Sequence, residues 1–332
     1  MAKPDDQNTS SSGMTPRRSL RAAVLAHRND YGFDAAAPPA LVHAPSVACV
    51  IPYHETGTLA SQVAAALLAS LRNYRDDVSA SAPDCRLVVV DDGSRLRPFQ
   101  APSRPQDIEL QVIRLESNQG RSRARNAGLR AASASGAEIT LFVDSDVLIP
   151  GNHVAHLLRA THPPGHAIAA SFFMTVRSAE RETLEQALGR ARIENDWRSE
   201  CVFEPSWIGC PADLEFVGRS FRLLEETRDW REWSGMVGPW CLANMVLGGC
   251  FTVPTDLAVS VGGFEESFDQ YGFTETTLIA KLIAAGCMVV PVLGSTAVHV
   301  ESQPAHLPQS QRNVRFRDAH QRFFGEFLAR AA

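Results

Sequence analysis

The chain has 332 residues, of which 45% are hydrophobic, and this length can fill the core of one large α/β domain. Its formal net charge of −5 provides no broad basic surface, which argues against nucleic acid or anionic lipid as a partner. The seven cysteines form no CxxC or Cys/His cluster, which argues against a disulfide framework or a structural zinc site and favours the reduced cytoplasm.

The N-terminal segment, residues 1–45, is rich in Ser, Pro, Asp and Ala without sustained periodicity. This composition predicts a mostly disordered tail with a short helix over 17–28. Its first residues lack the apolar core of a signal peptide, and no apolar stretch reaches the length of a transmembrane helix. We expect one folded domain over 46–302 and a C-terminal helical tail over 303–332.

Within the expected domain, apolar stretches alternate between strand and helix character. The first half predicts strands over 47–52, 86–90, 108–115, 138–143 and 167–176, and helices over 58–74, 120–134 and 153–160. The second half predicts apolar structure over 245–253, helices from 255 and over 274–285, and strands over 287–292 and 296–300. This alternation predicts an α/β fold with a mostly parallel sheet flanked by helices.

The stretch 178–238 differs from its surroundings because it is charged and contains four tryptophans, Trp197, Trp207, Trp230 and Trp233. We expect an inserted helical region that forms a lid or lines a binding site. Tryptophan rings can stack on the rings of a ligand, but packing within the protein is the alternative.

Two aspartates follow the apolar stretch ITLFV as Asp144-Ser145-Asp146. Residues two apart in extended backbone project to the same side, so both carboxylates can face one ligand. Hard divalent cations such as Mg²⁺ and Mn²⁺ take oxygen ligands and complete their shell with substrate phosphates. The pattern predicts a metal site, with a solvated turn as the alternative. His299, in the apolar stretch STAVHV, is a candidate third ligand or a structural strand residue.

A second polar group, Asp91-Asp92-Gly93-Ser94, ends the apolar stretch LVVV. A carboxylate at this position can accept a hydrogen bond from a nucleobase N–H or a ribose hydroxyl. The alternative is an Asp-Gly turn with helix-capping chemistry.

Three arginines, Arg121, Arg123 and Arg125, open the helix predicted over 120–134. Cations at a helix N-terminus oppose the macrodipole, which suggests an anionic partner such as a diphosphate or an aspartate of the site. A solvated basic face is the alternative, favoured for Arg123 because the three side chains cannot all point the same way.

Glu275 lies at the beginning of the helix predicted over 274–285, where a carboxylate is favoured. It is our candidate general base, and a helix-start residue of electrostatic use is the alternative. Upstream, the pair Gly248-Gly249 lies next to apolar residues and allows backbone to approach a ligand closely.

Eight motifs in order resemble the family 2 type of GT-A glycosyltransferases: VIPYHE, VVVDDGS, NQGRSRARNAG, LFVDSD, GGCFTVP, VGGFEESF, YGFTETTLIAKLIAAG and AVHVES. The resemblance covers about 46–301, with 178–238 unmatched. The stretch over 272–300 also looks like the C-terminal half of galactosyltransferase-like members. The resemblance implies a GT-A fold, a Rossmann-like single domain with an inserted acceptor or lid region.

The resemblance also implies roles for individual residues. For the nucleotide it points to Pro52, Glu55, Asp92, Arg121 or Arg125, and Asp144, and we add Tyr53 and Ser145 to these contacts. It also points to Asp144 and Asp146 for metal ligation and to Glu275 for catalysis. To these we add His299 as a metal ligand and Gly248, Gly249 and Thr274 as donor or acceptor sugar contacts. The usual family pattern has a Glu-Asp pair where Thr274-Glu275 stands, so the first carboxylate is absent and the second side chain is one methylene longer.

We therefore expect a hexosyltransferase that moves a sugar from a nucleotide diphosphate, with a UDP-sugar favoured, to an acceptor hydroxyl. Mn²⁺ or Mg²⁺ is the expected cofactor, and inversion at the anomeric carbon is the expected outcome. A retaining enzyme and a non-catalytic sugar-nucleotide-binding protein stay open. A nucleotidylyltransferase is disfavoured because PYHETGTLAS lacks the arginine that its phosphate loop needs. The acceptor and the oligomeric state, a homodimer included, also stay open.

Overall fold

The computed structural model describes residues 18–78, 82–103, 107–161, 166–177, 184–193, 202–203, 221–222, 242–269, 272–301 and 308–332. The helices and helical turns are α1 (Leu20–Ala26), α2 (Thr58–Asp77), α3 (Arg121–Ala134), α4 (His153–Thr161), α5 (Leu184–Ile193), η3 (Leu242–Met245), α7 (Thr255–Ser260), α8 (Thr274–Ala284), α9 (Gln309–Arg322) and η4 (Phe323–Phe327). The strands are β1 (Val47–Tyr53), β2 (Cys85–Asp91), β3 (Glu109–Arg114), β4 (Ile139–Val143), β5 (Val147–Leu148), β6 (Ala167–Arg177), β7 (Val202–Phe203), β8 (Phe221–Arg222), β9 (Cys250–Pro254) and β10 (Met288–Glu301).

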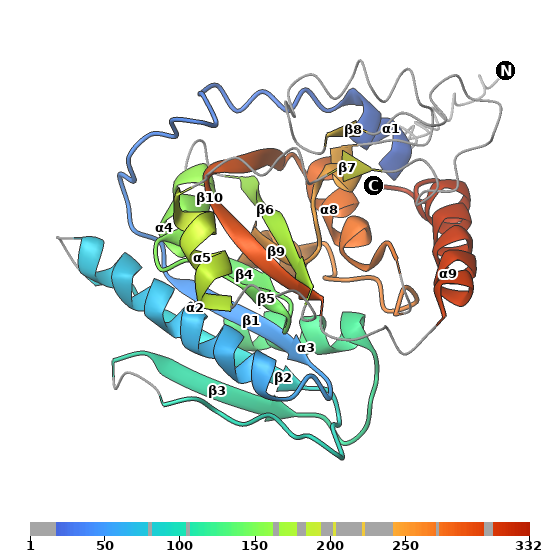
Figure 1. Cartoon of the computed structure of the whole chain (residues 1–332). Helices are drawn as coiled ribbons and strands as arrows, with labels where there is room; N and C mark the ends of the chain where they lie inside the picture. The colour runs from blue at the N-terminus through green and yellow to red at the C-terminus, as the bar shows by residue number, and fades with distance from the viewer. Residues whose placement is uncertain are drawn as a thin grey trace, which may run out of the picture.

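The main sheet has the strand order β3-β2-β1-β4-β9-β6-β10-β5. The pairs of β1 with β2 and β4, of β2 with β3, and of β6 with β10 are parallel, whereas β9 and β5 are antiparallel to their neighbours. All strands of this sheet except β5 and β9 therefore run in one direction, and the expected mostly parallel α/β sheet is confirmed (Figure 1). Their carboxyl ends lie along one edge of the sheet, where ligands bind in folds of this kind.

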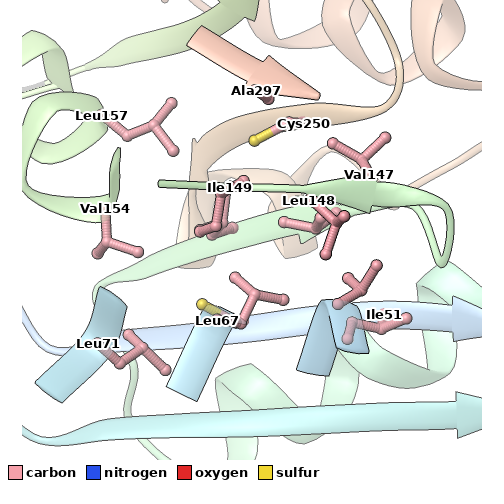
Figure 2. Close-up of a cluster of buried hydrophobic side chains, with 14 of the residues drawn as sticks. Ile51, Leu67, Leu71, Val147, Leu148, Ile149, Val154, Leu157, Cys250 and Ala297 are labelled. Atoms are coloured by element: carbon pink, nitrogen blue, oxygen red, sulfur yellow. The ribbon is translucent and has the colours of Figure 1, made fainter. Parts of the chain in front are cut away.

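Helices cover both faces of this sheet (Figure 1). Alternate residues of β1 point to opposite faces, so Cys49 and Ile51 pack with α2 and α4 while Val50 packs with α3 and α8. Figure 2 shows Leu67 of α2 between Ile51 and Leu71, with Leu71 farther along the helix toward Val154 of α4. Both leucines have no exposed surface, and burying each contributes about 1.5–3 kcal/mol relative to leaving it exposed. The sheet is thereby held rigidly between two apolar layers.

A buried polar network crosses the face covered by α4. His153 of α4 has no exposed surface, and its Nδ1 lies 2.8 Å from Ser295 Oγ while its Nε2 lies 3.0 Å from Ser171 Oγ. Ser295 reaches this position because the pairing of β10 with β6 shifts register between Val292 and Thr296. The two strands predicted over 287–292 and 296–300 are therefore one strand, interrupted only by this bulge.

The prediction of a tail over 1–45 does not hold for the described part, residues 18–45. The Asn29 side chain exchanges two hydrogen bonds with the backbone of Val289 in β10, at 2.7 and 3.1 Å, and Tyr31 is buried. The expected short helix is α1, and Ser19 before it pairs with Ala331 at the other end of the chain. A single polar side chain that binds a distant strand, as Asn29 does, produces no periodic pattern in the sequence, so such contacts could not be predicted from it.

The region expected as a helical insertion, 178–238, falls mostly outside the described residues, and so do its four tryptophans. Its described parts are α5 and the short pair β7–β8, joined at Val202↔Arg222 and Phe203↔Phe221. Among the helices of the described ranges, none combines the length and the apolar character that crossing a bilayer requires.

Candidate functional site

The Asp144-Ser145-Asp146 motif lies in a turn between β4 and β5, at the carboxyl edge of the sheet. Asp144 N–H donates to the Gly249 carbonyl at 2.8 Å, which continues the pairing of β4 with β9, and Val147 N–H donates back to the Asp144 carbonyl at 3.0 Å. Ser145 Oγ lies 2.8 Å from Thr56 Oγ1, in the loop after β1. The turn is therefore fixed from both neighbouring strands.

Asp146 and His299 are brought together by the antiparallel pairing of β5 with β10. His299 lies opposite Val147, and Val300 N–H donates to the Asp146 carbonyl at 2.9 Å. His299 Nε2 consequently lies 3.6 Å from Asp146 Oδ2, and both side chains are about one-third exposed. The Asp146 carboxylate and the His299 imidazole thus lie side by side at the same accessible part of the edge.

Arg125, on α3, occupies the centre of the site with a side chain that is 1% exposed. One terminal nitrogen donates to Asp144 Oδ1 at 2.7 Å and to the Gly248 carbonyl at 2.9 Å, and the other donates to Glu275 Oε2 at 3.5 Å. The guanidinium also lies 5.4 Å from the centroid of the Phe264 ring. Arg125 therefore joins the Asp144-Ser145-Asp146 turn to Glu275, the candidate base.

Burial by itself would raise the pKa of the Asp144 carboxyl, but the positive charges of Arg125 and Arg121 outweigh it and hold that pKa below its usual value. Arg121 lies one turn before Arg125, with a terminal nitrogen 4.0 Å from Asp144 Oδ2 and 55% of its side chain exposed. Of the two, Arg121 remains accessible to an anionic ligand, whereas Arg125 is enclosed by protein groups.

Glu275 is the second residue of α8, and its side chain is 23% exposed. It reaches the site through space left by a missing side chain, because a Cβ at Gly248 would lie 2.3 Å from Glu275 Cδ. We expected Gly248 and Gly249 to let backbone approach a ligand. Instead, Gly248 makes room for the Glu275 carboxyl, and a Cβ at Gly249 would press on Phe173 and Val147 at 3.1 Å.

Asp92 is 4% exposed and accepts hydrogen bonds from the backbone N–H groups of Gln119, at 2.7 Å, and Gly120, at 2.9 Å. It therefore anchors the start of α3, which carries both arginines of the site. This is the helix-capping alternative, and base recognition by Asp92 stays a prediction.

The residues after β1 also serve the protein's own backbone. Tyr53 is buried, and its hydroxyl donates to the Arg97 carbonyl and accepts from Gly57 N–H at 3.2 Å, so its nucleotide contact stays a prediction. The Glu55 carboxylate accepts hydrogen bonds from three consecutive N–H groups, those of Arg95 and Arg97 at 2.6 Å and that of Leu96 at 2.9 Å. These hydrogen bonds lower the pKa of Glu55, and the bond from Leu96 contributes most.

Two further predicted residues have different surroundings. Thr274 is 2% exposed, and its Oγ1 donates to the Phe268 carbonyl at 3.0 Å, so its hydroxyl already has a protein partner and its sugar contact stays a prediction. A hydroxyl satisfied by backbone has replaced the first carboxylate of the usual pair. Pro52 is half-buried at the end of β1, where it pairs with Val90.

Within the described residues, no group of three or more His, Cys, Asp or Glu side chains is arranged to hold a metal ion. The predicted ligand set of Asp144, Asp146 and His299 is not among such groups, and Asp144 Oδ1 accepts a hydrogen bond from Arg125. Asp146 and His299 supply an adjacent carboxylate and imidazole, a donor pair that suits Mn²⁺ when phosphate oxygens complete the shell.

Several solved structures are similar to this chain at low sequence identity. The structure of GalNAc-T7 with UDP, GalNAc and Mn²⁺ has a TM-score of 0.50 and 15% identity, over 83% of this chain and 48% of that one. The mannosyltransferase PcManGT from Pyrobaculum calidifontis with GDP-Man and Mn²⁺ has a TM-score of 0.49 and 16% identity, over 86% and 65%. S. aureus TarS 1-349 with UDP-GlcNAc has a TM-score of 0.47 and 14% identity, over 79% and 60%.

The chain thus spans about half to two-thirds of the length of these structures. The first likeness confirms the expected GT-A fold. Comparison with curated protein sequences finds no significant match. The sequence profile described as Glycosyl transferase family 2 matches residues 48–225, more than half of the chain. The chain therefore belongs to glycosyl transferase family 2.

Proposed function

We propose that this protein transfers a sugar from a nucleotide diphosphate to an acceptor hydroxyl. The observation that carries the proposal is the bridge through Arg125, which brings Asp144 of the β4–β5 turn and Glu275 of α8 to one point at the carboxyl edge of the sheet. A donor-side carboxylate and a candidate base meet there although they are 131 positions apart, by the difference of their numbers in the sequence.

The donor diphosphate is proposed to lie against Arg121, Asp146 and His299. Arg121 presents an accessible guanidinium in the first turn of α3, and the Asp146–His299 pair is the candidate cation site. A bound Mn²⁺ or Mg²⁺ would supply positive charge that stabilises the leaving diphosphate. A UDP-sugar is the favoured donor, and the UDP and Mn²⁺ bound to the similar GalNAc-T7 structure support this choice.

Glu275 is the proposed general base, which takes the proton from the acceptor hydroxyl as the hydroxyl oxygen attacks the anomeric carbon. Attack from the face opposite the leaving diphosphate would invert the configuration. Arg125 and the space above Gly248 orient the Glu275 carboxyl. The region 178–238 is proposed to bind the acceptor or to form a lid, as an insertion in the domain over 46–302.

Replacing Glu275 with Gln tests this role. Full-length protein is incubated with Mn²⁺ and UDP-glucose, UDP-GlcNAc or GDP-mannose, and release of the nucleotide diphosphate to water or to an added acceptor is followed. Loss of the base should lower turnover about 100-fold or more, whereas the affinity for UDP changes little because Glu275 acts in the transition state.

Glu266→Gln is the matched control, because Glu266 is a partly exposed carboxylate that pairs with Arg123 and accepts a hydrogen bond from Asn126. Equal turnover by Glu275→Gln and Glu266→Gln would remove Glu275 from the mechanism. The anomeric configuration of the first-formed product, read by NMR, separates inversion from retention.

A further inference from the structure

Phe273, the residue before Thr274-Glu275, has an uncommon backbone conformation. Its φ of 59° and ψ of 9° lie in the left-handed region, which bulky side chains rarely adopt. Its carbonyl accepts the hydrogen bond from Thr277 N–H at 3.1 Å, so this conformation starts α8. A backbone state that is unfavourable on its own persists only where the surroundings stabilise it.

The surroundings of the Phe273 ring come from the C-terminal segment. The Phe323 ring stacks on it at 5.0 Å between centroids, and the rings of Phe316, His320 and Phe324 lie at 5.4, 5.7 and 6.0 Å. These four residues belong to α9 and η4, and with Phe273 they form what we call the aromatic cage. Phe323 has no exposed surface and Phe273 is 5% exposed.

The residue before Phe273 also lies against the cage. Gly272 has a φ of 100°, and a Cβ there would lie 2.9 Å from Phe316 Cδ2. The chain therefore enters α8 through two consecutive residues with positive φ, both in contact with α9. Since Glu275 is two residues beyond Phe273, the backbone of this entry decides the direction in which its carboxylate points.

We infer that the aromatic cage is a positioning device, in which α9 and η4 hold Phe273 in its left-handed conformation and so aim Glu275 at Arg125 and Asp144. The expected effect on kcat rests on the proposed function of Glu275, whereas the expected effect on the start of α8 does not. The C-terminal segment would accordingly be needed for turnover although it supplies no group to the substrate.

A cluster that only stabilises the core could contain the same rings. The test must therefore separate an effect on the start of α8 from a general loss of packing. Phe323→Leu removes the ring stacked on Phe273. Phe327→Leu is the matched control, because Phe327 also lies in η4 and is 1% exposed. It stacks on Phe323 and contacts Phe268, but in the described structure its ring makes no contact with the Phe273 ring. Phe316→Leu and Phe316→Tyr form a second, half-buried pair, in which the tyrosine keeps the ring.

The first measurement is hydrogen–deuterium exchange of the Thr277 amide in the full-length protein, and the second is donor turnover with UDP-sugar and Mn²⁺. We expect Phe323→Leu to speed exchange about tenfold and lower kcat about tenfold, with the donor KM within about twofold of wild type. Phe327→Leu should leave both values near wild type, and Phe316→Tyr should restore what Phe316→Leu loses.

Equal exchange of the Thr277 amide in Phe323→Leu and Phe327→Leu would overturn the positioning inference, and so would equal loss of kcat. If Phe323→Leu does not fold, the Phe316 pair gives the same decision. A wild-type protein that turns over no donor would instead refute the proposed function, and the exchange measurement would still decide whether the cage fixes the start of α8.

Discussion

Arg125 is the residue whose replacement should reveal most about how the site is held together. Arg125→Met removes the guanidinium and keeps an apolar stem of similar length beside Phe264. Asp144, whose side chain is 19% exposed, would then keep the more distant and more exposed Arg121 at 4.0 Å as an ion-pair partner, and the Gly248 carbonyl would lose the Arg125 donor. Removing one member of a buried ion pair leaves an uncompensated charge.

For such a loss we expect the free energy of unfolding to fall by about 3–5 kcal/mol. Arg123→Met is the matched control on the same helix, because its ion pair with Glu266 at 3.0 Å joins side chains that are 51% and 42% exposed. Exposed pairs of this kind contribute about 0.2–1 kcal/mol. Arg125→Met should therefore lower the free energy of unfolding several-fold more than Arg123→Met does.

Urea unfolding followed by circular dichroism measures both variants, with Asp144→Asn added to each background. In the Arg125→Met background, Asp144→Asn should recover part of the lost stability, because it removes the charge left unpaired. A cost for Arg125→Met no larger than that of Arg123→Met would refute the view that Arg125 is a structural bridge. Arg125 would then be free for the diphosphate contact that the sequence suggested.

Two further changes test other parts of the structure. Gly248→Ala would place a Cβ 2.3 Å from Glu275 Cδ and displace the carboxyl, so donor turnover should fall about 100-fold in the same kinetic assay while Gly325→Ala, with open space around it, has no effect. Burial lowers the pKa of His153 from its usual 6.5 to about 3, so the unfolded chain takes up a proton first as the pH falls. The contribution of His153 to the free energy of unfolding should be full above about pH 6.5 and fall by about 1.4 kcal/mol per pH unit down to about pH 3. Urea titrations should find the pH dependence of stability shallower by that amount in His153→Gln.

The carboxylates of the site could be predicted from the sequence because each follows or begins an element with a clear pattern. Asp144 and Asp146 follow the buried stretch of β4, and Glu275 opens an apolar helix. In a mostly parallel sheet, the ends of such strands share one edge, so the pattern gives both the residues and their approximate place. The boundaries of most elements followed from periodicity in the same way.

The partners of those side chains could not be predicted, because they depend on distances between distant segments. Nothing local distinguishes Arg125 from Arg121, yet one is enclosed and the other is 55% exposed. Asp92 was expected at a nucleobase, but two backbone N–H groups at the start of α3 satisfy its oxygens. Short polar residues give the same sequence signal whether they bind a ligand or cap a helix.

The departure from the usual Glu-Asp pair becomes intelligible once these partners are known. The longer side chain of Glu275 reaches past the missing Cβ of Gly248 to within 3.5 Å of Arg125, and an aspartate at this position would be one methylene shorter. Thr274 needs no charge, because its hydroxyl is satisfied by the Phe268 carbonyl. Gly248, Arg125 and Glu275 therefore form one unit. Gly248 leaves space for the long Glu275 side chain, and the Arg125 guanidinium supplies the charge that the Glu275 carboxylate meets at the end of that space.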